Sequence, residues 1–545
     1  MTNRNKKHRK HGPRQTGVFA RAAARTRTWM LLLCLVLAGL AVYSNSFQGV
    51  FLYDDITAIQ LNPAIRDTYS PDWIWRTPEG STIDQREVVQ WTLALNYALG
   101  KLDPAGYHLF NFMVHAACSL LLFFIVRDTA HRTRWGRRHW PASRWTAFAA
   151  ALWWTVHPLQ TQAVTYVIQR AESLASFFYL LTLYAAMRGF EADTGTAGGR
   201  KGRSWTIVAI VSCWLGAGTK EILVSVPLAV MLHDWLFSEK PFRDLLKHRF
   251  PLYAALASVW LLLAARLAFG SVTTMLASRG QVSSLEYFRI QSEVIPHYLR
   301  LTVWPFGQVF DYYDWPIPPI GWRMALSVTA LGAALVVGLV GMLRRRWFAF
   351  PILLVFMLLA PTSSFLPLLS HAVEHRMYLA LAPLLLLLTA AGAFLATKIA
   401  HAFSSARRQQ IVIGLSTAVF AALVLWHASL AHLRNRLYRS KETIWRDVCD
   451  KRPHNPRARV ALGKCLIESG RTTEGLHQMR KALEIGHHPG VQAAAHYNLA
   501  NHYFDLDRLD EALHHYSEAL EGVGKTPRIE AAYVNRALVY MKMKR

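Results

Sequence analysis

The sequence has little of what holds a soluble or secreted domain together. Only 5 of its 545 residues are cysteine and only 17% are charged. So few thiols exclude a scaffold built on disulfides. So little charge, beside 52% apolar residues, argues against a soluble protein. Long apolar runs recur along the first four fifths of the chain, and a lipid bilayer is therefore its predicted solvent.

Acidic residues are also scarce, since 34 Asp and Glu stand against 61 Lys and Arg for a formal net charge of +27. Nucleic acid is not the predicted partner, because no basic stripe interleaved with exposed aromatic residues accompanies this excess. Much of the excess lies beside apolar runs, as the positive-inside bias of membrane proteins requires. The sequence also has no thiol cluster, no HExxH and no phosphate-cradling Gly-rich loop.

Eleven apolar segments are predicted to cross the membrane. They are Trp29–Phe47, Tyr107–Val126, Trp145–His157, Ala163–Met187, Trp205–Gly218, Ile222–Phe237, Leu252–Gly270, Trp322–Leu343, Phe348–Leu369, Met377–Ala400 and Ile411–Leu430. This assignment puts every basic connector in the cytoplasm, with the N-terminus inside and the C-terminus outside. The alternative for the first segment is a cleaved signal peptide, but its length and the poor cleavage site at 43–45 favour an uncleaved anchor.

A twelfth apolar segment, Phe288–Trp304, is interpreted differently. If it crossed the membrane, the three arginines at 344–346 would move to the outer face, against the charge bias. It is therefore predicted to be a surface or re-entrant helix. An ordinary tilted span is the alternative.

Residues 431–545 have a different character, with amphipathic helical patterns that repeat. Small and aromatic residues recur at spacings typical of TPR helix pairs, in two full copies and one further helix. The segment Ser440–Asp450 is expected to cap the stack. Within this part Cys449 and Cys465 either form a disulfide or, as favoured here, stay unpaired in helices. The predicted domains are a basic cytoplasmic tail (1–28), a membrane domain (29–430, with a first outer loop at 48–106) and a helical repeat domain (431–545).

An acid pair gives the sharpest functional signal, because ionisable residues at a membrane edge cost free energy. Asp54 and Asp55 follow the first span directly. Such a pair supplies a general base or a ligand for a divalent cation. Because adjacent side chains diverge, one of the two is expected to be catalytic and the other to orient the loop by hydrogen bonding. The alternative is a pair that only caps a helix or turn, where Asp is common.

Other ionisable residues are predicted near the outer ends of later spans. They are Arg86, His108, His157, Arg170, Glu172, Lys220, Glu221, Glu374, His375 and Arg376. The cations suit capture of a phosphate, with structural ion pairs as the alternative. The histidines suit supporting roles or core positions satisfied by backbone groups. On one predicted face and beside an acid pair, these groups together predict a site for an anionic substrate.

The order of several motifs resembles a known family. The motifs are Phe51-Leu-Tyr-Asp-Asp-Ile, Thr92-Leu-Ala-Leu-Asn-Tyr, Gly106-Tyr-His-Leu-Phe-Asn, His157-Pro, Gln169-Arg-Ala-Glu-Ser-Leu, Gly218-Thr-Lys-Glu and Glu374-His-Arg-Met-Tyr-Leu. Followed by a TPR array, they resemble bacterial relatives of the transmembrane-and-TPR O-mannosyltransferases, which are GT-C glycosyltransferases. The array is shorter here than in the eukaryotic members, and a histidine separates the acid from the arginine in the last motif.

The resemblance implies an all-α, GT-C-like membrane bundle and an inverting transfer of a sugar. The sugar, mannose in the named relatives, would pass from a polyprenyl-phosphate carrier to Ser/Thr hydroxyls of proteins on the outer face. Asp54, in preference to Asp55, would be the base. The donor phosphate would be held by Arg376, Lys220, Arg86 and Arg170. Supporting roles would fall to His108, His157, Glu172, Glu221, Glu374 and His375.

The same resemblance implies the partners of the chain. Apart from the lipid-linked sugar donor, no cofactor is required, and a divalent metal is compatible with the acid pair but not predicted. The implied partners are membrane lipid and an acceptor protein or peptide, reached in part through the TPR domain, and no nucleic acid. The implied location is the inner membrane of a bacterium, with the TPR domain in the periplasm.

Two other functions compete with this prediction. A membrane-anchored TPR scaffold without catalysis would use the repeats to bind proteins, but it has no need of acids and bases at the ends of successive helices. A transporter or flippase of lipid-linked sugars would place charges near the centres of its spans or between interrupted helices. Here the charges gather at one end of the predicted spans.

Overall fold

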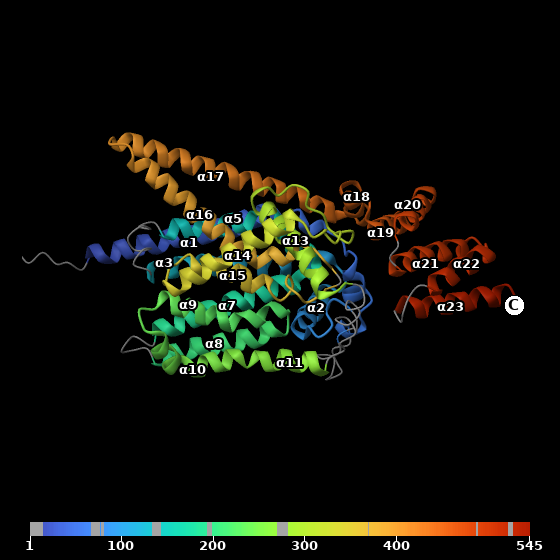
Figure 1. The fold of residues 1–545 in the computed structure, drawn as a ribbon, viewed down its shortest axis with the longest axis horizontal. Helices are drawn as coiled ribbons and strands as arrows, with labels where there is room; N and C mark the ends of the chain where they lie inside the picture. Colours follow the sequence, from blue (N-terminus) through green and yellow to red (C-terminus); the bar gives the residue numbers. More distant parts are fainter. Residues whose placement is uncertain are drawn as a thin grey trace, which may run out of the picture.

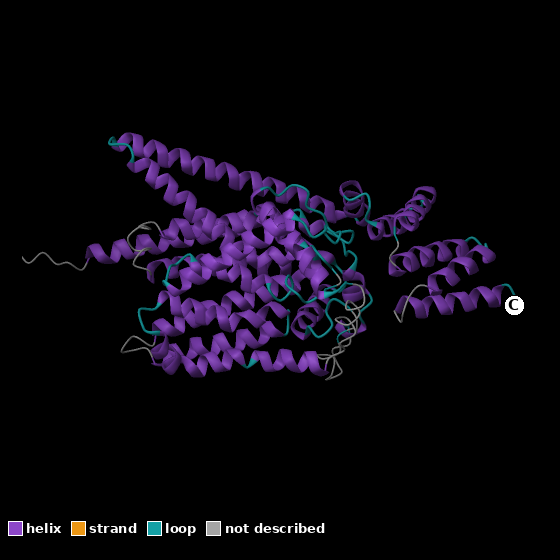
Figure 2. Ribbon diagram, viewed as in Figure 1, coloured by secondary structure: helices purple, strands orange, loops and turns teal. Residues whose placement is uncertain are grey.

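The computed structural model describes residues 15–66, 77, 81–132, 143–192, 199–269, 282–368, 370–486, 489–521 and 527–544. Within these ranges the regular structure is helical and contains no strand (Figure 2). The first part consists of α1 (Gln15–Tyr43), α2 (Glu87–Gly100), α3 (Pro104–Arg132), α5 (Ser143–Val156), α6 (Thr161–Thr165), α7 (Arg170–Ala192), α8 (Gly199–Ala217), α9 (Val226–Phe237), α10 (Phe242–Ala257), α11 (Val259–Phe269), α13 (Ser284–Val303), α14 (Trp322–Leu343), α15 (Ala349–Leu359), α16 (Met377–His401) and α17 (Ala406–Asn435). The first fourteen residues of the predicted basic tail lie outside the described residues.

Among the described residues, six helices are long and apolar enough to cross a membrane. They are Thr26–Gln48, Pro104–Arg132, Phe242–Arg266, Trp322–Leu343, Glu374–His401 and Ala406–Arg439. Each overlaps one of the eleven predicted spans, and the chain is a multi-pass membrane protein. The other five predicted spans fall on α5, α7, α8, α9 and α15, which are shorter or more polar. The eleven-span topology stays a prediction.

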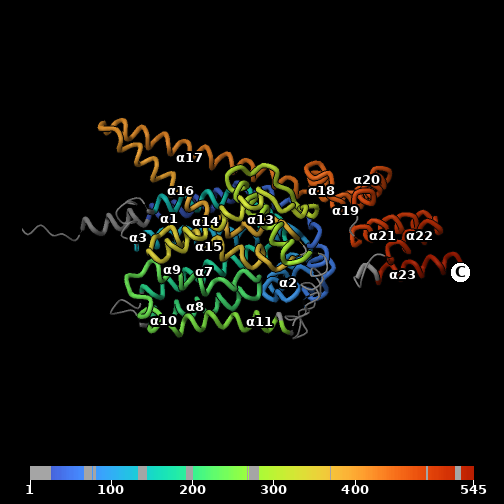
Figure 3. Tube along the Cα trace, in the orientation of Figure 1, coloured from blue at the N-terminus to red at the C-terminus, as the bar shows by residue number. Residues whose placement is uncertain are grey.

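The helices of the first part lie side by side in a bundle, and the hairpin of α16 and α17 extends from one side of it (Figure 1). The tube in Figure 3 shows that α1 enters the bundle at one end and that the chain leaves α17 at the other. The C-terminal helices lie beyond that second end. The start of α1 and the repeats thus lie at opposite ends of the bundle (Figure 1), and the orientation across the membrane stays a prediction.

The predicted surface helix at Phe288–Trp304 is α13. It begins with a capping box, in which Ser283 and Glu286 each bond the backbone amide of the other. It packs against α14 and α16. Two buried tyrosines tie it to the next part of the chain, since the Tyr287 hydroxyl donates to the Thr362 carbonyl and that of Tyr298 to the Val373 carbonyl. It is not among the six candidate spans.

The helix is interrupted between α6 and α7, where a continuous span was predicted from Ala163. This interruption is called the break before α7. After α6 the backbone of Tyr166 is extended, one short turn follows at Val167–Gln169, and α7 begins only at Arg170. The amide of Ile168 in this turn is free to bond outside the helix, and it donates to Asp55. The break therefore anchors the first outer loop on the bundle.

The C-terminal part has the repeat pattern that the sequence predicts. It consists of α18 (Lys441–Lys451), α19 (Pro456–Glu468), α20 (Thr472–Ile485), α21 (Pro489–Asp505), α22 (Leu509–Glu521) and α23 (Pro527–Lys542). α19 with α20 and α21 with α22 form the two hairpins, α23 packs on α22, and α18 covers α19. A Cβ at Gly463 would lie 2.8 Å from the Gly475 carbonyl oxygen, so this hairpin needs glycine to pack. Cys449 and Cys465 are free thiols.

Candidate active site

Asp55 is fully buried and its carboxylate bonds only to backbone. One oxygen accepts from the Leu52 amide at 2.8 Å, and the other accepts from the Ile168 amide at 2.8 Å. The first bond closes the turn around the acid pair, and the second ties this turn to the break before α7. Burial raises the pKa of Asp55 well above its usual range, while the two backbone bonds lower it. Asp55 is therefore the loop-orienting member of the pair.

Asp54 is half-buried, whereas Asp55 is fully enclosed. Its amide donates to the Tyr166 hydroxyl at 2.9 Å. Burial raises the pKa of Asp54 to about 6, although Arg457, Tyr166 and Arg86 act in the opposite direction. A carboxylate with this pKa is ionised at neutral pH and is a stronger base than an ordinary aspartate.

The backbone just before Asp54 is strained. Tyr53 has φ = +34°, a region that side chains with a Cβ rarely adopt. Its ring meets Trp445 of α18 edge to face, with 5.6 Å between the ring centroids. Backbone strain of this kind persists only where the surroundings impose it, and it gathers at functional sites.

Glu374 is a buried hub for the loop that follows α13. One of its oxygens accepts from the Val309 amide and the Tyr312 hydroxyl, both at 2.7 Å, and the other accepts from the Gln308 side chain at 3.1 Å. Arg434 completes the set with an ion pair at 3.0 Å. The loop at 308–312 is thus held against the start of α16.

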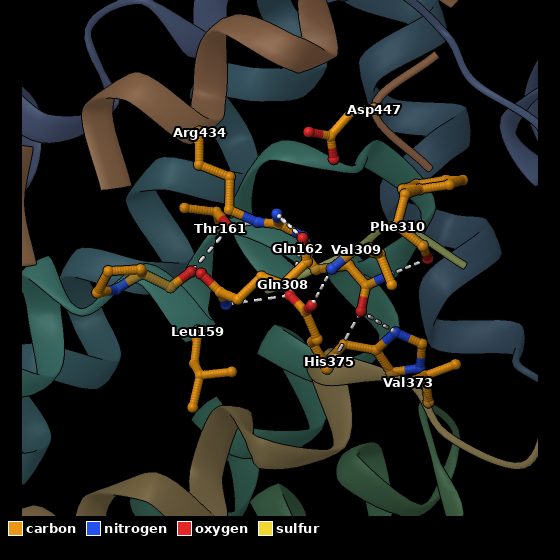
Figure 4. Close-up of polar contacts among 12 residues, drawn as sticks. Leu159, Thr161, Gln162, Gln308, Val309, Phe310, Val373, His375, Arg434 and Asp447 are labelled. Carbon is orange, nitrogen blue, oxygen red and sulfur yellow. Dashed lines mark hydrogen bonds and ion pairs between the residues drawn. The ribbon is translucent and has the colours of Figure 1, made fainter. Parts of the chain in front are cut away.

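Gln162 connects this hub to the neighbouring arginine motif. Its side-chain amide donates to the Phe310 carbonyl at 3.0 Å, and its oxygen accepts from the His375 backbone amide at 2.9 Å (Figure 4). The Phe310 ring in turn meets Tyr166 edge to face at 4.9 Å. A continuous set of contacts therefore runs from Asp54, through Tyr166, to the Glu374-His-Arg motif.

Arg376 is buried, and its guanidinium bonds to neutral oxygens. It donates to the Ser370 carbonyl at 2.7 Å, to the His371 carbonyl at 3.1 Å and to the Tyr287 hydroxyl at 3.4 Å. None of these oxygens carries a full charge, so the positive charge of Arg376 is not cancelled by direct contact. A phosphate oxygen is a stronger acceptor than any of the three.

Two of the other predicted cations have acidic partners. Lys220 and Glu172 form a buried ion pair. Arg86 bonds Glu221 at 3.1 Å, in a pair where the acid is half exposed.

Arg170 is buried inside the bundle. Its guanidinium donates to the Asn96 side chain at 2.6 Å and to the Tyr107 carbonyl at 3.2 Å, and it lies 4.7 Å from the centroid of the Phe110 ring. These contacts join α7 to α2 and α3. In this arrangement Arg170 supports the bundle under the site and is not open to a lipid phosphate.

Two of the three predicted histidines, His108 and His157, are also buried. His157 donates to the Thr302 carbonyl at 3.0 Å and accepts from the Leu159 amide at 3.2 Å, so backbone groups satisfy both ring nitrogens. The ring of His108 packs directly on Gly49, where an added Cβ would lie 2.7 Å from Nε2. The His157 ring therefore fits the core interpretation, in which backbone groups satisfy the histidine, whereas neither ring nitrogen of His108 makes a hydrogen bond within the described residues.

Sequence reasoning missed four residues that shape this site, namely Gln162, Tyr166, Arg434 and Arg457. Arg434 and Arg457 both lie in the segment 431–545, interpreted only as a repeat domain. Two arginines at the junction between the last span and the first repeat were a signal of a charged contact between domains. The two polar residues before α7 became informative only with the break in that helix.

Comparisons with known proteins point to one group of enzymes. The Protein O-mannosyl-transferase TMTC2 of Mus musculus is 34% identical over 169 residues, which are 29% of this chain and 19% of that protein. The Protein O-mannosyl-transferase Tmtc3 of Drosophila melanogaster is 32% identical over 197 residues, 33% of this chain and 21% of that protein. The chain is a distant homologue of these proteins, and the matched stretch spans about a fifth of their length. This confirms the resemblance drawn from the motifs.

Two further comparisons concern the repeats and the fold. The family model for the anaphase-promoting complex, cyclosome, subunit 3 matches residues 434–519, which include both hairpins of the repeat part up to α22. Among solved structures, the crystal structure of ArnT from Cupriavidus metallidurans bound to undecaprenyl phosphate aligns with a TM-score of 0.36 and 14% identity. That alignment covers 88% of this chain and 79% of the other.

Proposed function

We propose that this protein is an inverting membrane glycosyltransferase of the GT-C type. It moves a sugar, in the first instance mannose, from a polyprenyl-phosphate carrier to a Ser or Thr hydroxyl of a protein. The observation that carries the proposal is that a half-buried Asp54 is connected, by a continuous set of contacts, to the motif of Arg376. The positive charge of Arg376 is not cancelled by direct contact. Homology to protein O-mannosyl-transferases supports the class of reaction.

The base of the reaction is Asp54. Its carboxylate takes the proton of the acceptor hydroxyl while the oxygen attacks the anomeric carbon of the sugar. The bond from that carbon to the carrier phosphate breaks as the new glycosidic bond forms on the opposite face, which inverts the configuration. A pKa of about 6 leaves Asp54 ionised at neutral pH and able to receive this proton.

The leaving group is the polyprenyl phosphate, which gains negative charge as the sugar departs. Arg376 offers it a planar guanidinium in place of the carbonyls that hold this side chain now. Lys220 and Arg86 are the further cations proposed to assist, although each already forms an ion pair, with Glu172 and Glu221 respectively. This scheme needs no metal ion.

The location proposed for the site is the extracytoplasmic end of the bundle, in the inner membrane of a bacterium. A basic N-terminal segment on the cytoplasmic side supports this orientation. The repeats, at the opposite end of the bundle from the start of α1, then lie in the periplasm, where they can present an acceptor protein. Labelling of single cysteines in α2 and in α20 with an impermeant thiol reagent, in right-side-out vesicles, tests this location. Reaction only after the vesicles are opened would contradict it.

The test of the function is transfer by the full-length protein in membranes. Undecaprenyl-phosphate-linked mannose with a labelled sugar and a Ser/Thr-rich peptide serve as donor and acceptor. Asp54→Asn should reduce transfer by about 10²-fold or more, the range of a lost general base. Asp450→Asn, which changes an exposed acid of α18, is the matched control.

Two results would contradict the proposal. Full turnover by the Asp54→Asn variant would remove the base. Movement of the lipid-linked sugar across the membrane without transfer to any peptide would favour a transporter.

A further inference from the structure

The first repeat helix contacts the membrane part beside Asp54. Arg457 of α19 forms an ion pair with Asp311 in the loop after α13, and its Nε donates to the second carboxylate oxygen at 3.0 Å. Asn455, at the start of the same helix, donates to that oxygen at 3.0 Å as well. Asp311 is buried by these contacts.

Arg457 also lies between two aromatic rings. Its guanidinium carbon is 4.3 Å from the centroid of the Tyr313 ring and 5.9 Å from that of Tyr53. Tyr53 is the strained residue that precedes Asp54. Tyr313 packs in addition against a small apolar cluster of the repeats that includes Val460 and Ala494. Arg457 therefore connects the turn at Tyr53 and Asp54, the loop after α13 and the first two repeats.

Burial is the main influence on the pKa of Asp54, and charged or titratable groups of several elements act on it as well. They are Arg457 from α19, Asp311 from the loop, Tyr166 from the break before α7 and Arg86 from the segment before α2, beside the adjacent Asp55. The first two are the partners of one ion pair, and they act on the Asp54 carboxylate with opposite sign. Any change in that pair alters the electrostatic surroundings of the base.

We propose that Arg457 is a positioning residue of the transfer site, which makes the first repeat helix a working part of the active site. With Asp311 it holds the strained Tyr53 turn and balances the charge beside Asp54. A polypeptide bound to the repeats would thus lie against the groups that set the base. This inference rests on the proposed function, because it assigns Arg457 a role toward the proposed base.

The test compares pH profiles of mannose transfer for two variants of one ion pair, in membranes that hold the full-length protein. Arg457→Gln leaves the Asp311 charge uncompensated near Asp54, so the acid limb of the profile should move to higher pH by about one unit. Asp311→Asn leaves the Arg457 charge uncompensated, so the limb should move to lower pH. The double variant should return close to the original profile.

A merely structural role predicts something else, because both single variants break the same contact and would lose activity in the same way. Arg457→Lys keeps the charge and should leave the limb in place even if the rate falls. Arg459→Gln is the matched control, since Arg459 lies on the same helix but bonds the Pro453 carbonyl and Gln478.

The inference would be overturned if the acid limb of the pH profile lay at the same pH in Arg457→Gln and Asp311→Asn. It would also be overturned if the limb moved in the same direction in both variants. If Asp54→Asn keeps full activity, the proposed function itself fails. If Asp54→Asn is inactive but the acid limb does not move in the Arg457 and Asp311 variants, only the inference about Arg457 fails. Should Arg457→Gln not accumulate in the membrane, the direction of the shift in Asp311→Asn and the position of the limb in Arg457→Lys decide the matter.

Discussion

Arg434, near the end of α17, forms an ion pair with Glu374, at the start of the α16 span, with 3.0 Å between Nη2 and Oε2. Both side chains are enclosed, and the same arginine donates to the Gln308 carbonyl at 2.9 Å and to the Thr161 hydroxyl. Through this pair the two last spans, the loop at 308–312 and the turn before α6 meet at one point. The pair is thus the structural centre on which the candidate site rests.

Glu374→Gln should therefore destabilise the protein strongly. Removing one charge of a buried pair leaves the other uncompensated, which typically costs about 3–5 kcal/mol. The melting temperature of the detergent-solubilised protein measures this. Glu442→Gln is the control, because its pairs with Arg446 and Arg471 are partly exposed and such pairs contribute little to stability. Equal melting temperatures for the two variants would contradict this central role for the pair.

The two adjacent aspartates should respond differently to the same substitution. Asp55→Asn replaces a carboxylate that accepts two backbone bonds by an amide that can accept only on one atom, and it should lower stability by about 1–3 kcal/mol. Asp54→Asn should leave stability nearly unchanged and remove transfer. Measuring melting temperature and transfer rate on both variants separates the roles. A reversed pattern would make Asp55 the base.

Transfer should depend on pH through the ionisation of Asp54. Burial raises its pKa to about 6, and only the ionised form can take the acceptor proton. The rate should thus rise as pH increases through about 6 and level off above it, when donor and acceptor are not limiting. A rate profile from pH 4.5 to 8 in membranes checks this. A rate already constant at pH 5 would exclude a base with the raised pKa.

Arg376→Ala should weaken use of the donor more than use of the acceptor. A charge-assisted bond to phosphate contributes about 1.5–3 kcal/mol, which corresponds to a donor KM raised roughly 10- to 100-fold. Kinetics with varied donor and fixed peptide, then the reverse, measure the two constants. Arg300→Ala, which changes an exposed arginine of α13 bonded to the Phe306 carbonyl, is the control. An unchanged donor KM would reject the phosphate role.

Much of the architecture could be predicted from local patterns. Continuous apolar segments indicated membrane helices, and six of them are long enough in the structure to cross a bilayer. The spacing of small and aromatic residues predicted the TPR hairpins, and in the first of them α19 and α20 approach closely at Gly463. The membrane helices and the TPR hairpins both follow from the pattern of apolar and small residues within one short segment, and this pattern can be seen in the sequence.

The break before α7 could not be predicted in the same way. Hydropathy of the segment from 163 is high enough for a continuous helix, and only the bond from Ile168 to Asp55 shows why the chain turns there instead. The same contact also decided which aspartate orients the loop. These decisions depend on a partner 113 positions away, which no local pattern contains.

The sequence by itself determined that this chain is a membrane protein and that repeats follow its spans. It also determined the resemblance of its motifs to those of protein O-mannosyl-transferases. Only the tertiary structure decided which charges meet: Asp55 bonds backbone while Asp54 is half-buried, Arg376 keeps an uncancelled charge, and Arg457 reaches Asp311 from 146 positions along the chain. The physical reason is that hydrophobic patterns act within one helix, whereas the partner of a buried charge depends on how distant helices pack.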